Sequence, residues 1–142
     1  MTKLCPCCKE AIPLSQLWES LSVCKCGHHF RIDARRRIRY MADEGSFQEL
    51  FGDLESQDIL EFEGYMEKLE SARFACGEKE AVVCGLAEVG GIPCAMFVME
   101  PFFMMGSMGT VVGENITRLF EYARELSLPV VGFTVSGGAR MQ

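Results

Sequence analysis

The residues best suited to chemistry are cysteines near the N-terminus. The chain contains eight cysteines, and five of them lie before residue 27. Four of these five form a C-x-x-C pair, Cys5 with Cys8, and a C-x-C pair, Cys24 with Cys26. Two close thiol pairs joined by a short connector are typical of a zinc ribbon, in which four thiolates hold one ion tetrahedrally and leave no open position. The pattern predicts one structural zinc ion, and a module this small is expected to fold only with metal bound.

Two glycine-rich segments offer a second kind of chemistry. One is "MMGSMG", and the other is "SGGAR", which contains Gly137 and Gly138. Backbone N–H groups exposed in such turns can receive a developing oxyanion without reorganisation. Neither segment contains a cysteine or is flanked by a carboxylate pair, and no histidine follows His29, so nucleophilic and acid–base catalysis lack candidates. The segments predict stabilisation of an enolate-like anion by backbone amides.

The elements expected around these segments belong to an α/β fold. "AVVCGLAEV" and "CAMFVME" have the character of two strands joined by a Gly-Gly turn. "TVVGENITRLFEYARELSLP" predicts a helix, supported by a Glu114–Arg118 pair at i,i+4, and Val130 to Val135 predicts a short buried strand after it. A strand, a helix and a strand in succession predict parallel pairing in a sheet covered by helices. Both glycine segments then follow strands at the same end of the sheet, where ligands bind in open sheets.

Three segments are predicted along the chain: a zinc ribbon over residues 1–32, a helical connector over 33–80, and an α/β core over 81–142. In the connector, Ser46 and Glu49 have the form of a capping box. One helix is therefore expected to end near Asp43 and another to begin at Ser46.

Charge and hydropathy set further limits. The net charge is -6, but residues 1–40 carry eight basic against three acidic side chains, so the acidic excess lies in the remainder. The N-terminus lacks the features of a signal peptide, and the most apolar stretch is interrupted by Glu100 and Pro101, so we expect a cytoplasmic protein with no membrane segment. A basic run beside the ribbon could contact nucleic-acid phosphates, although a solvated helix face is the favoured interpretation. The run comprises Arg31, Arg35, Arg36, Arg37 and Arg39.

Several motifs together resemble a known family. They are the four-cysteine ribbon, "GHHFRIDARRRI", "DEGSF", "FMMGSMGTVVGENITRLFEYA" and "SGGARMQ", in this order. The chain closely resembles the N-terminal half of the carboxyltransferase β subunit of bacterial acetyl-CoA carboxylase. The resemblance implies a zinc ribbon followed by the first part of a ClpP/crotonase-type core. It also implies transfer of the carboxyl group from carboxybiotin, carried on the biotin carboxyl carrier protein, to acetyl-CoA to form malonyl-CoA for fatty-acid synthesis.

The resemblance also implies roles for particular residues and partners. Gly137 and Gly138 would supply oxyanion-hole amides for one of the two enolate-like species, while biotin would take the methyl proton. The substrate loop would consist of Gly106, Ser107, Met108 and Gly109. A carboxyltransferase α subunit would complete an α2β2 assembly and the complementary oxyanion hole, and biotin carboxylase would act alongside. Because the family continues beyond SGGARMQ, we expect the chain alone to be inactive.

Two positions depart from the family pattern. The second cysteine pair is one residue shorter than the usual C-x-x-C, which leaves Cys7 or His28 as alternative ligands. Met105 stands where the family usually has the first of two glycines before the serine of the substrate loop. The alternative interpretation of the whole chain is a non-catalytic zinc-ribbon module that binds nucleic acid, or a structural fragment.

Overall fold

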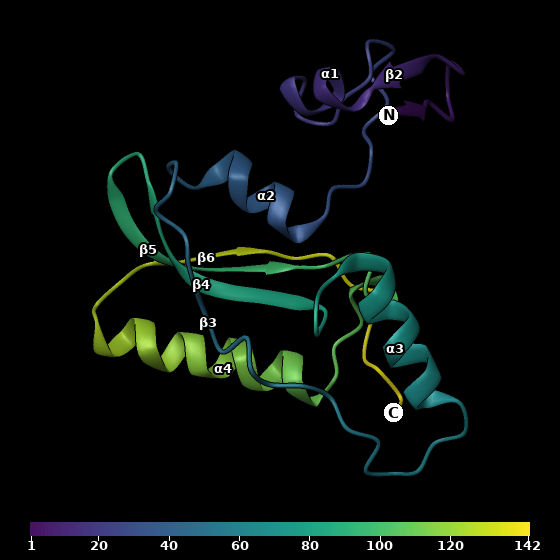
Figure 1. The fold of residues 1–142 in the computed structure, drawn as a ribbon. Coiled ribbons are helices and arrows are strands. Elements are labelled where there is room, and N and C mark those ends of the chain that lie inside the picture. The colour runs from purple at the N-terminus through teal and green to yellow at the C-terminus, as the bar shows by residue number, and fades with distance from the viewer. The chain divides into compact units, whose positions relative to one another are not determined.

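In the computed structural model, which describes residues 1–142, the chain divides after Ile32 into two units (Figure 1). The first unit contains the antiparallel strands β1 (Thr2–Leu4) and β2 (Ala11–Pro13) and the short helix α1 (Leu14–Glu19). Its buried hydrophobic core consists of Cys5, Ile12, Leu17, Cys24 and Phe30. Two of these five are members of the predicted ligand set, so very little apolar surface stabilises this unit apart from the cysteines.

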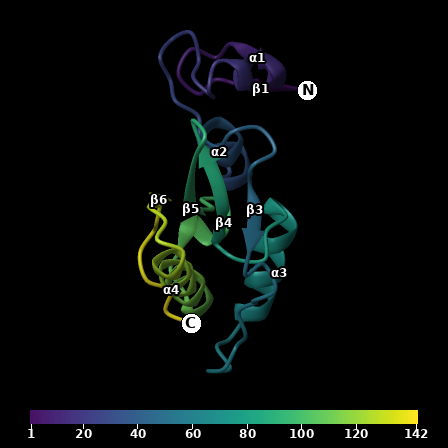
Figure 2. The same ribbon diagram turned by 90° about the vertical axis from the view of Figure 1, so that its left-hand side faces the viewer.

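The second unit is built on a four-stranded sheet in the order β3-β4-β5-β6 (Figure 2). The strands are β3 (Gln48–Leu50), β4 (Val82–Val89), β5 (Ile92–Met99) and β6 (Val130–Phe133). The predicted hairpin is confirmed: β4 and β5 are antiparallel, and they are joined by Gly90 and Gly91, which both have positive φ as a tight hairpin turn requires. The predicted parallel pairing is confirmed for β5 and β6, whereas β3 and β4 are antiparallel, so the sheet is mixed.

Helices cover both faces of this sheet (Figure 1). Alternate residues of β4 and β5 face opposite ways, so Val82 and Met99 belong to one hydrophobic cluster while Val83 and Val98 belong to the other. Helix α4 (Thr110–Glu125) packs in the first cluster through Val112, Leu119 and Ala123, together with α3 (Tyr65–Cys76). Helix α2 (Ala34–Met41) packs in the second through Ala34 and Ile38. No helix is long and apolar enough to cross a membrane.

The long helix between the glycine segments is confirmed as α4, and Arg118 Nε donates to Glu114 Oε1 at 2.7 Å as its i,i+4 spacing predicts. The strand after it differs from the prediction in two respects. It ends at Phe133 rather than Val135, and its residues are partly exposed rather than buried. Both differences follow from its position at the edge of the sheet, where only β5 pairs with it.

The helix predicted to begin at Ser46 is wrong, because residues 48–50 form strand β3. Ser46 serves the β4–β5 hairpin instead: its hydroxyl donates to the Asp43 carbonyl at 2.8 Å and accepts from the Glu88 amide at 3.1 Å. Glu49 reaches Arg35 on α2 rather than the start of a helix. Tertiary pairing therefore overrides a local capping pattern, and the segment predicted as a helical connector contributes a strand to the sheet.

A buried carboxylate links the end of β5 to the start of α2. The Glu100 side chain accepts from the Ala34 amide at 2.7 Å and from the Phe102 amide at 2.8 Å, and the residue is 1% exposed. Burial raises the pKa of Glu100 above its usual 4.5, an effect that the two amides oppose and that the charges of Asp33 and Glu78 reinforce.

This raised pKa predicts a pH-dependent stability. Between the unfolded and folded pKa values the folded state binds more protons, so the contribution of Glu100 is fully present below about pH 4.5 and is lost as the pH rises through the folded pKa. We expect Glu100→Gln to remove this component. Urea denaturation of both proteins at a series of pH values should show a difference in unfolding free energy that changes across this range and then levels off. A difference that is independent of pH would contradict the prediction.

Candidate functional site

The four predicted cysteine ligands lie together in the N-terminal unit. The sulfur atoms of Cys5, Cys8, Cys24 and Cys26 are all within 4.8 Å of one another. Neither Cys7, which is exposed, nor His28 belongs to this group. The short C-x-C pair therefore still brings both of its thiols to the cluster.

The dimensions and chemistry of the cluster fit a zinc ion. A tetrahedral site with Zn–S distances of about 2.3 Å has sulfur atoms about 3.8 Å apart. The Cys5–Cys26 and Cys8–Cys24 sulfur separations are 3.7 and 3.6 Å. Burial raises the pKa of the Cys5 thiol, but hydrogen bonds from the Cys8 and Cys7 amides and from the Cys8 and Cys24 thiols outweigh it and lower the pKa to about 7. Although an amide also donates to the sulfur of Cys8 and of Cys24, burial and the neighbouring thiols raise the pKa of these two residues. Amides directed at sulfur stabilise a thiolate, which is the form that binds metal.

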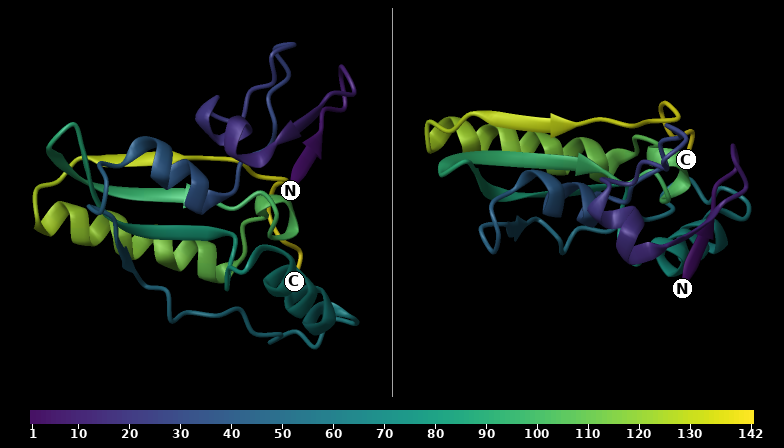
Figure 3. Two further views of the ribbon diagram at one scale, coloured as in Figure 1. Left: turned by 45° about the horizontal axis from the view of Figure 1, so that its top comes forward. Right: turned by 90° about the horizontal axis from the view of Figure 1, so that it is seen from above.

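The two glycine segments lie side by side in the second unit, as the sequence predicts. The segment after β5 includes the short 3-10 turn η1 (Met104–Gly106), and the segment after β6 continues to the C-terminus (Figure 3). The Met108 amide donates to the Gly138 carbonyl at 2.9 Å, and the Arg140 amide donates to the Met108 carbonyl at 2.9 Å. These bonds extend the parallel β5–β6 pairing beyond the strands, as the Met108–Ala139 bridge also shows. Residues 105–109 and 136–140 are thus joined to each other, and we call these two stretches together the rim.

The two predicted oxyanion donors differ in their surroundings. The Gly137 amide donates to the Met105 carbonyl at 2.9 Å, a backbone bond that helps to join the segments. The Gly138 amide donates to the hydroxyl of Ser136 at 3.0 Å in an exposed turn. Because a hydroxyl can rotate away, the Gly138 amide can be released to a ligand without breaking the rim, whereas the Gly137 amide cannot.

Gly106 is required for a backbone contact. Its φ is +68°, and a Cβ placed on it would lie 2.2 Å from the carbonyl oxygen of Val135. Only glycine allows the two segments to approach this closely. Ser107 and Gly109 face Arg140: the Ser107 hydroxyl accepts from its guanidinium, and a Cβ on Gly109 would lie 3.0 Å from it.

Met105 adopts a conformation that glycine would favour. Its φ and ψ are 58° and 29°, in the left-handed region, and the neighbouring Met104 also has positive φ. The side chain of Met105 is exposed, and with Met104 it lines an open groove of about 560 Å³ along α3. The α3 residues of this groove are Glu67, Lys68, Ser71 and Ala72.

Replacing Met105 with glycine is therefore expected to stabilise the fold. A residue with a Cβ is less stable in the left-handed region by about 1–2 kcal/mol, and glycine avoids this cost. Glycine also has more conformational freedom in the unfolded chain, which offsets about 0.5–1 kcal/mol of the gain. We expect the free energy of unfolding to rise by up to about 1 kcal/mol in urea denaturation. Met108→Gly is the matched control, because Met108 does not have positive φ and should lose stability. Equal losses in both variants would contradict the prediction.

Two charged residues of this region received no role in the sequence analysis. Arg140 and Glu80 form an ion pair with Nη2–Oε1 at 2.6 Å, and their side chains are 1% and 2% exposed. Arg140 is the charged residue of the SGGAR segment, and this position could have identified it from the sequence. Glu80 lies before β4 and could not be paired with it from the sequence.

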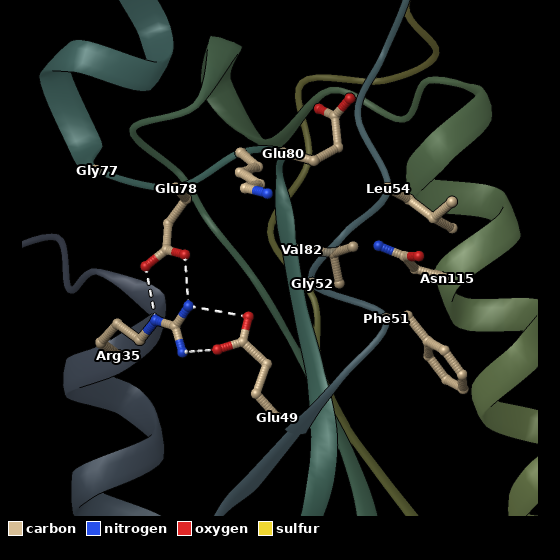
Figure 4. Close-up of a pocket in the computed structure, with 11 residues that line it drawn as sticks. Arg35, Glu49, Phe51, Gly52, Leu54, Gly77, Glu78, Glu80, Val82 and Asn115 are labelled. Atoms are coloured by element: carbon tan, nitrogen blue, oxygen red, sulfur yellow. Dashed lines mark hydrogen bonds and ion pairs between the residues drawn. The ribbon is translucent and has the colours of Figure 1, made fainter.

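A second ion-pair cluster occupies part of the basic run. Arg35 on α2 binds Glu49 at 2.5 Å and Glu78 at 2.7 Å, beside a pocket of about 170 Å³ (Figure 4). In this view Glu80 turns its carboxylate away from the Arg35 cluster. Arg37 lies with its guanidinium 5.5 Å from the centre of the Phe133 ring. Two of the arginines considered for phosphate binding therefore have contacts within the unit.

The comparisons with known proteins agree with this architecture. The carboxyl transferase domain family matches residues 31–142. The chain is 56% identical over 140 residues to an acetyl-coenzyme A carboxylase carboxyl transferase subunit beta of Ruminiclostridium cellulolyticum, covering 98% of this chain and 49% of that protein. It is 50% identical over 143 residues to a subunit beta 2 of Lachnospira eligens, covering 100% and 55%. The structure of transcarboxylase 12S with hydrolysed methylmalonyl-coenzyme A bound matches with a TM-score of 0.66 at 27% identity, covering 79% of this chain and 20% of that one.

The chain belongs to the carboxyl transferase domain family, and its second unit has the α/β fold of crotonase-like carboxyltransferases. The predicted fold class is therefore confirmed. The chain spans about half the length of the curated relatives that it matches.

Proposed function

We propose that the chain is the zinc-ribbon and N-terminal core part of an acetyl-CoA carboxylase carboxyltransferase of the β-subunit type. The observation that carries the proposal is the joined rim of two glycine segments after β5 and β6 in a member of this family. The names of the two relatives support acetyl-CoA as the acceptor. The reaction would break the C–N bond of carboxybiotin, form a C–C bond at the methyl carbon of acetyl-CoA, and return the methyl proton to biotin.

In this proposal the chain holds and stabilises the reacting groups rather than exchanging protons. The Gly138 amide would donate to the enolate-like oxygen of acetyl-CoA or biotin, since its present partner is a rotatable hydroxyl. The Gly137 amide would hold the rim in place. The loop from Gly106 to Gly109 would shape the substrate site, and the groove lined by Met104 and Met105 would take an apolar part of a substrate.

The N-terminal unit would bind one structural zinc ion through Cys5, Cys8, Cys24 and Cys26. The proposed partners are the carboxyltransferase α subunit, the biotin carboxyl carrier protein and biotin carboxylase. The nucleic-acid alternative is not favoured, because Arg35 and Arg37 of the basic run are engaged by Glu49, Glu78 and Phe133.

The test is carboxyl transfer between malonyl-CoA and a biotin derivative. The chain is mixed with an α subunit, with and without a supplied C-terminal half of a β subunit. We expect activity when both are present, and a loss of about a hundredfold if the Gly138 amide is replaced by a backbone ester, which removes the N–H donor and keeps a residue that can adopt φ +112°. Inactivity of every mixture containing folded, zinc-bound chain would overturn the proposal.

A further inference from the structure

The guanidinium of Arg140 contacts three separate parts of the second unit. In the sequence, Arg140 comes two residues after the Gly137–Gly138 turn. Its Nε donates to the Ser107 hydroxyl and its Nη2 to the Ser107 carbonyl, both at 3.0 Å. Its Nη1 donates to the Tyr65 hydroxyl on α3 at 3.2 Å and to Glu80 Oε2 at 3.0 Å. One buried side chain therefore joins the turn after β6, the loop after β5, and the segment that leads from α3 into β4.

Only arginine has the donors for this arrangement. The planar guanidinium presents five N–H groups in a fixed fork, whereas a lysine ammonium has three donors at a single point. Bidentate pairing with Glu80 fixes the plane of the fork, and the remaining donors then reach Ser107 and Tyr65. Glu80 is in turn held by the Ser56 hydroxyl and by the Ala81 amide at 2.9 Å. Glu80, which is not part of the rim, therefore determines the orientation of the guanidinium.

The hydrogen bond from Arg140 determines the direction in which the Ser107 hydroxyl can donate. Its hydroxyl oxygen accepts a hydrogen bond from a cation, so its own hydrogen is directed away from Arg140. Ser107 is only partly buried, so that hydrogen remains available to an acceptor outside the chain. A hydroxyl that accepts from a charged donor is also polarised toward donation.

We propose that Arg140 is a positioning residue, anchored by Glu80 and Tyr65, which fixes the Gly137–Gly138 turn against the substrate loop and presents the Ser107 hydroxyl as a hydrogen-bond donor to a substrate oxygen. The identity of that oxygen rests on the proposed function, while the positioning of the rim does not. In the alternative, Arg140 and Glu80 only neutralise each other's charge. The variants must distinguish this electrostatic role from the positioning role.

Three variants make this separation. Arg140→Lys keeps the charge opposite Glu80 but loses the fork. The double variant Arg140→Met with Glu80→Gln removes both charges, so no charge is left buried without a partner. Arg118→Lys is the matched control, because Arg118 forms an exposed ion pair with Glu114 on α4, away from the rim.

The first measurement is amide hydrogen exchange of the chain itself, followed by NMR. We expect exchange at Met108, Gly137 and Arg140 to accelerate at least about tenfold in Arg140→Lys and in the double variant, with the α4 amides unchanged. Exchange in the double variant at the rate of the unsubstituted chain would mean that the pair only balances charge, and it would overturn the proposal. So would unchanged exchange in Arg140→Lys.

The second measurement is carboxyl transfer in the reconstituted assembly. We expect Arg140→Lys to lower kcat by about ten- to a hundredfold with little change in KM for malonyl-CoA, as misplacement of a reacting group does. Ser107→Ala should lower kcat as well while leaving amide exchange at the rim unchanged. If the unsubstituted assembly is inactive, the proposed function fails, but the exchange measurement still judges the positioning role.

Discussion

Replacing Cys24 with serine is expected to abolish zinc binding and to unfold residues 1–32. The core of this unit has only five buried hydrophobic residues, and Cys24 is one of them. A core of this size cannot offset the conformational entropy of about thirty residues, so the free energy of metal binding, on the order of 10 kcal/mol or more, must supply the stability. We expect the zinc content to fall from one ion per chain to none, as measured by elemental analysis.

The same variant should leave the second unit folded, because residues 33–142 have their own sheet and two hydrophobic clusters. Amide exchange should therefore show lost protection only before residue 33. Cys7→Ser is the matched control, since Cys7 lies in the same loop but outside the sulfur cluster, and it should retain zinc. Retention of zinc by Cys24→Ser, or its loss from Cys7→Ser, would exclude the proposed ligand set.

Replacing Gly106 with alanine is expected to separate the two glycine segments. The new methyl group would lie 2.2 Å from the Val135 carbonyl oxygen, which is backbone and cannot turn aside, and alanine is also unfavourable at φ +68°. Together these effects should lower the free energy of unfolding by about 2–4 kcal/mol and abolish carboxyl transfer in the reconstituted assembly. Urea denaturation and the transfer assay measure the two effects.

Gly113→Ala provides the control for this substitution. Gly113 lies within α4, has no atom within 4 Å of an added Cβ, and does not have positive φ. Alanine there should stabilise the helix by about 0.5–1 kcal/mol. If Gly106→Ala were as stable as Gly113→Ala, the close approach of the two segments would not exist in solution.

Local patterns predicted the elements that local interactions determine. The β4–β5 hairpin follows from its Gly-Gly turn, and α4 follows from its apolar spacing. The adjacency of the glycine segments followed from the strand, helix and strand order, which needs no side-chain detail. The clustering of four thiols followed from their spacing, even though the second pair is short.

Contacts distant in sequence could not be predicted in this way. The Glu80–Arg140 pair joins residues 60 positions apart, and neither side chain indicates its partner. The strand at residues 48–50 replaced an expected helix because pairing with β4 outweighed a capping pattern. The residue type of Met105 does not favour its left-handed conformation, and the only sign of that conformation was the glycine that the family usually has at this position.

The parallel pairing of β5 with β6 also bears on the order in which the molecule folds. The hairpin closes between Val89 and Ile92, whereas β6 meets β5 through Val130 and Ala95, with the whole of α4 between them. Closing the longer loop costs more chain entropy, so the hairpin can form early while the last strand docks later. The rim that follows β6 is therefore among the last parts of the chain to assemble. A cell that degrades partly folded chains would encounter this protein with its hairpin complete and the rim not yet formed.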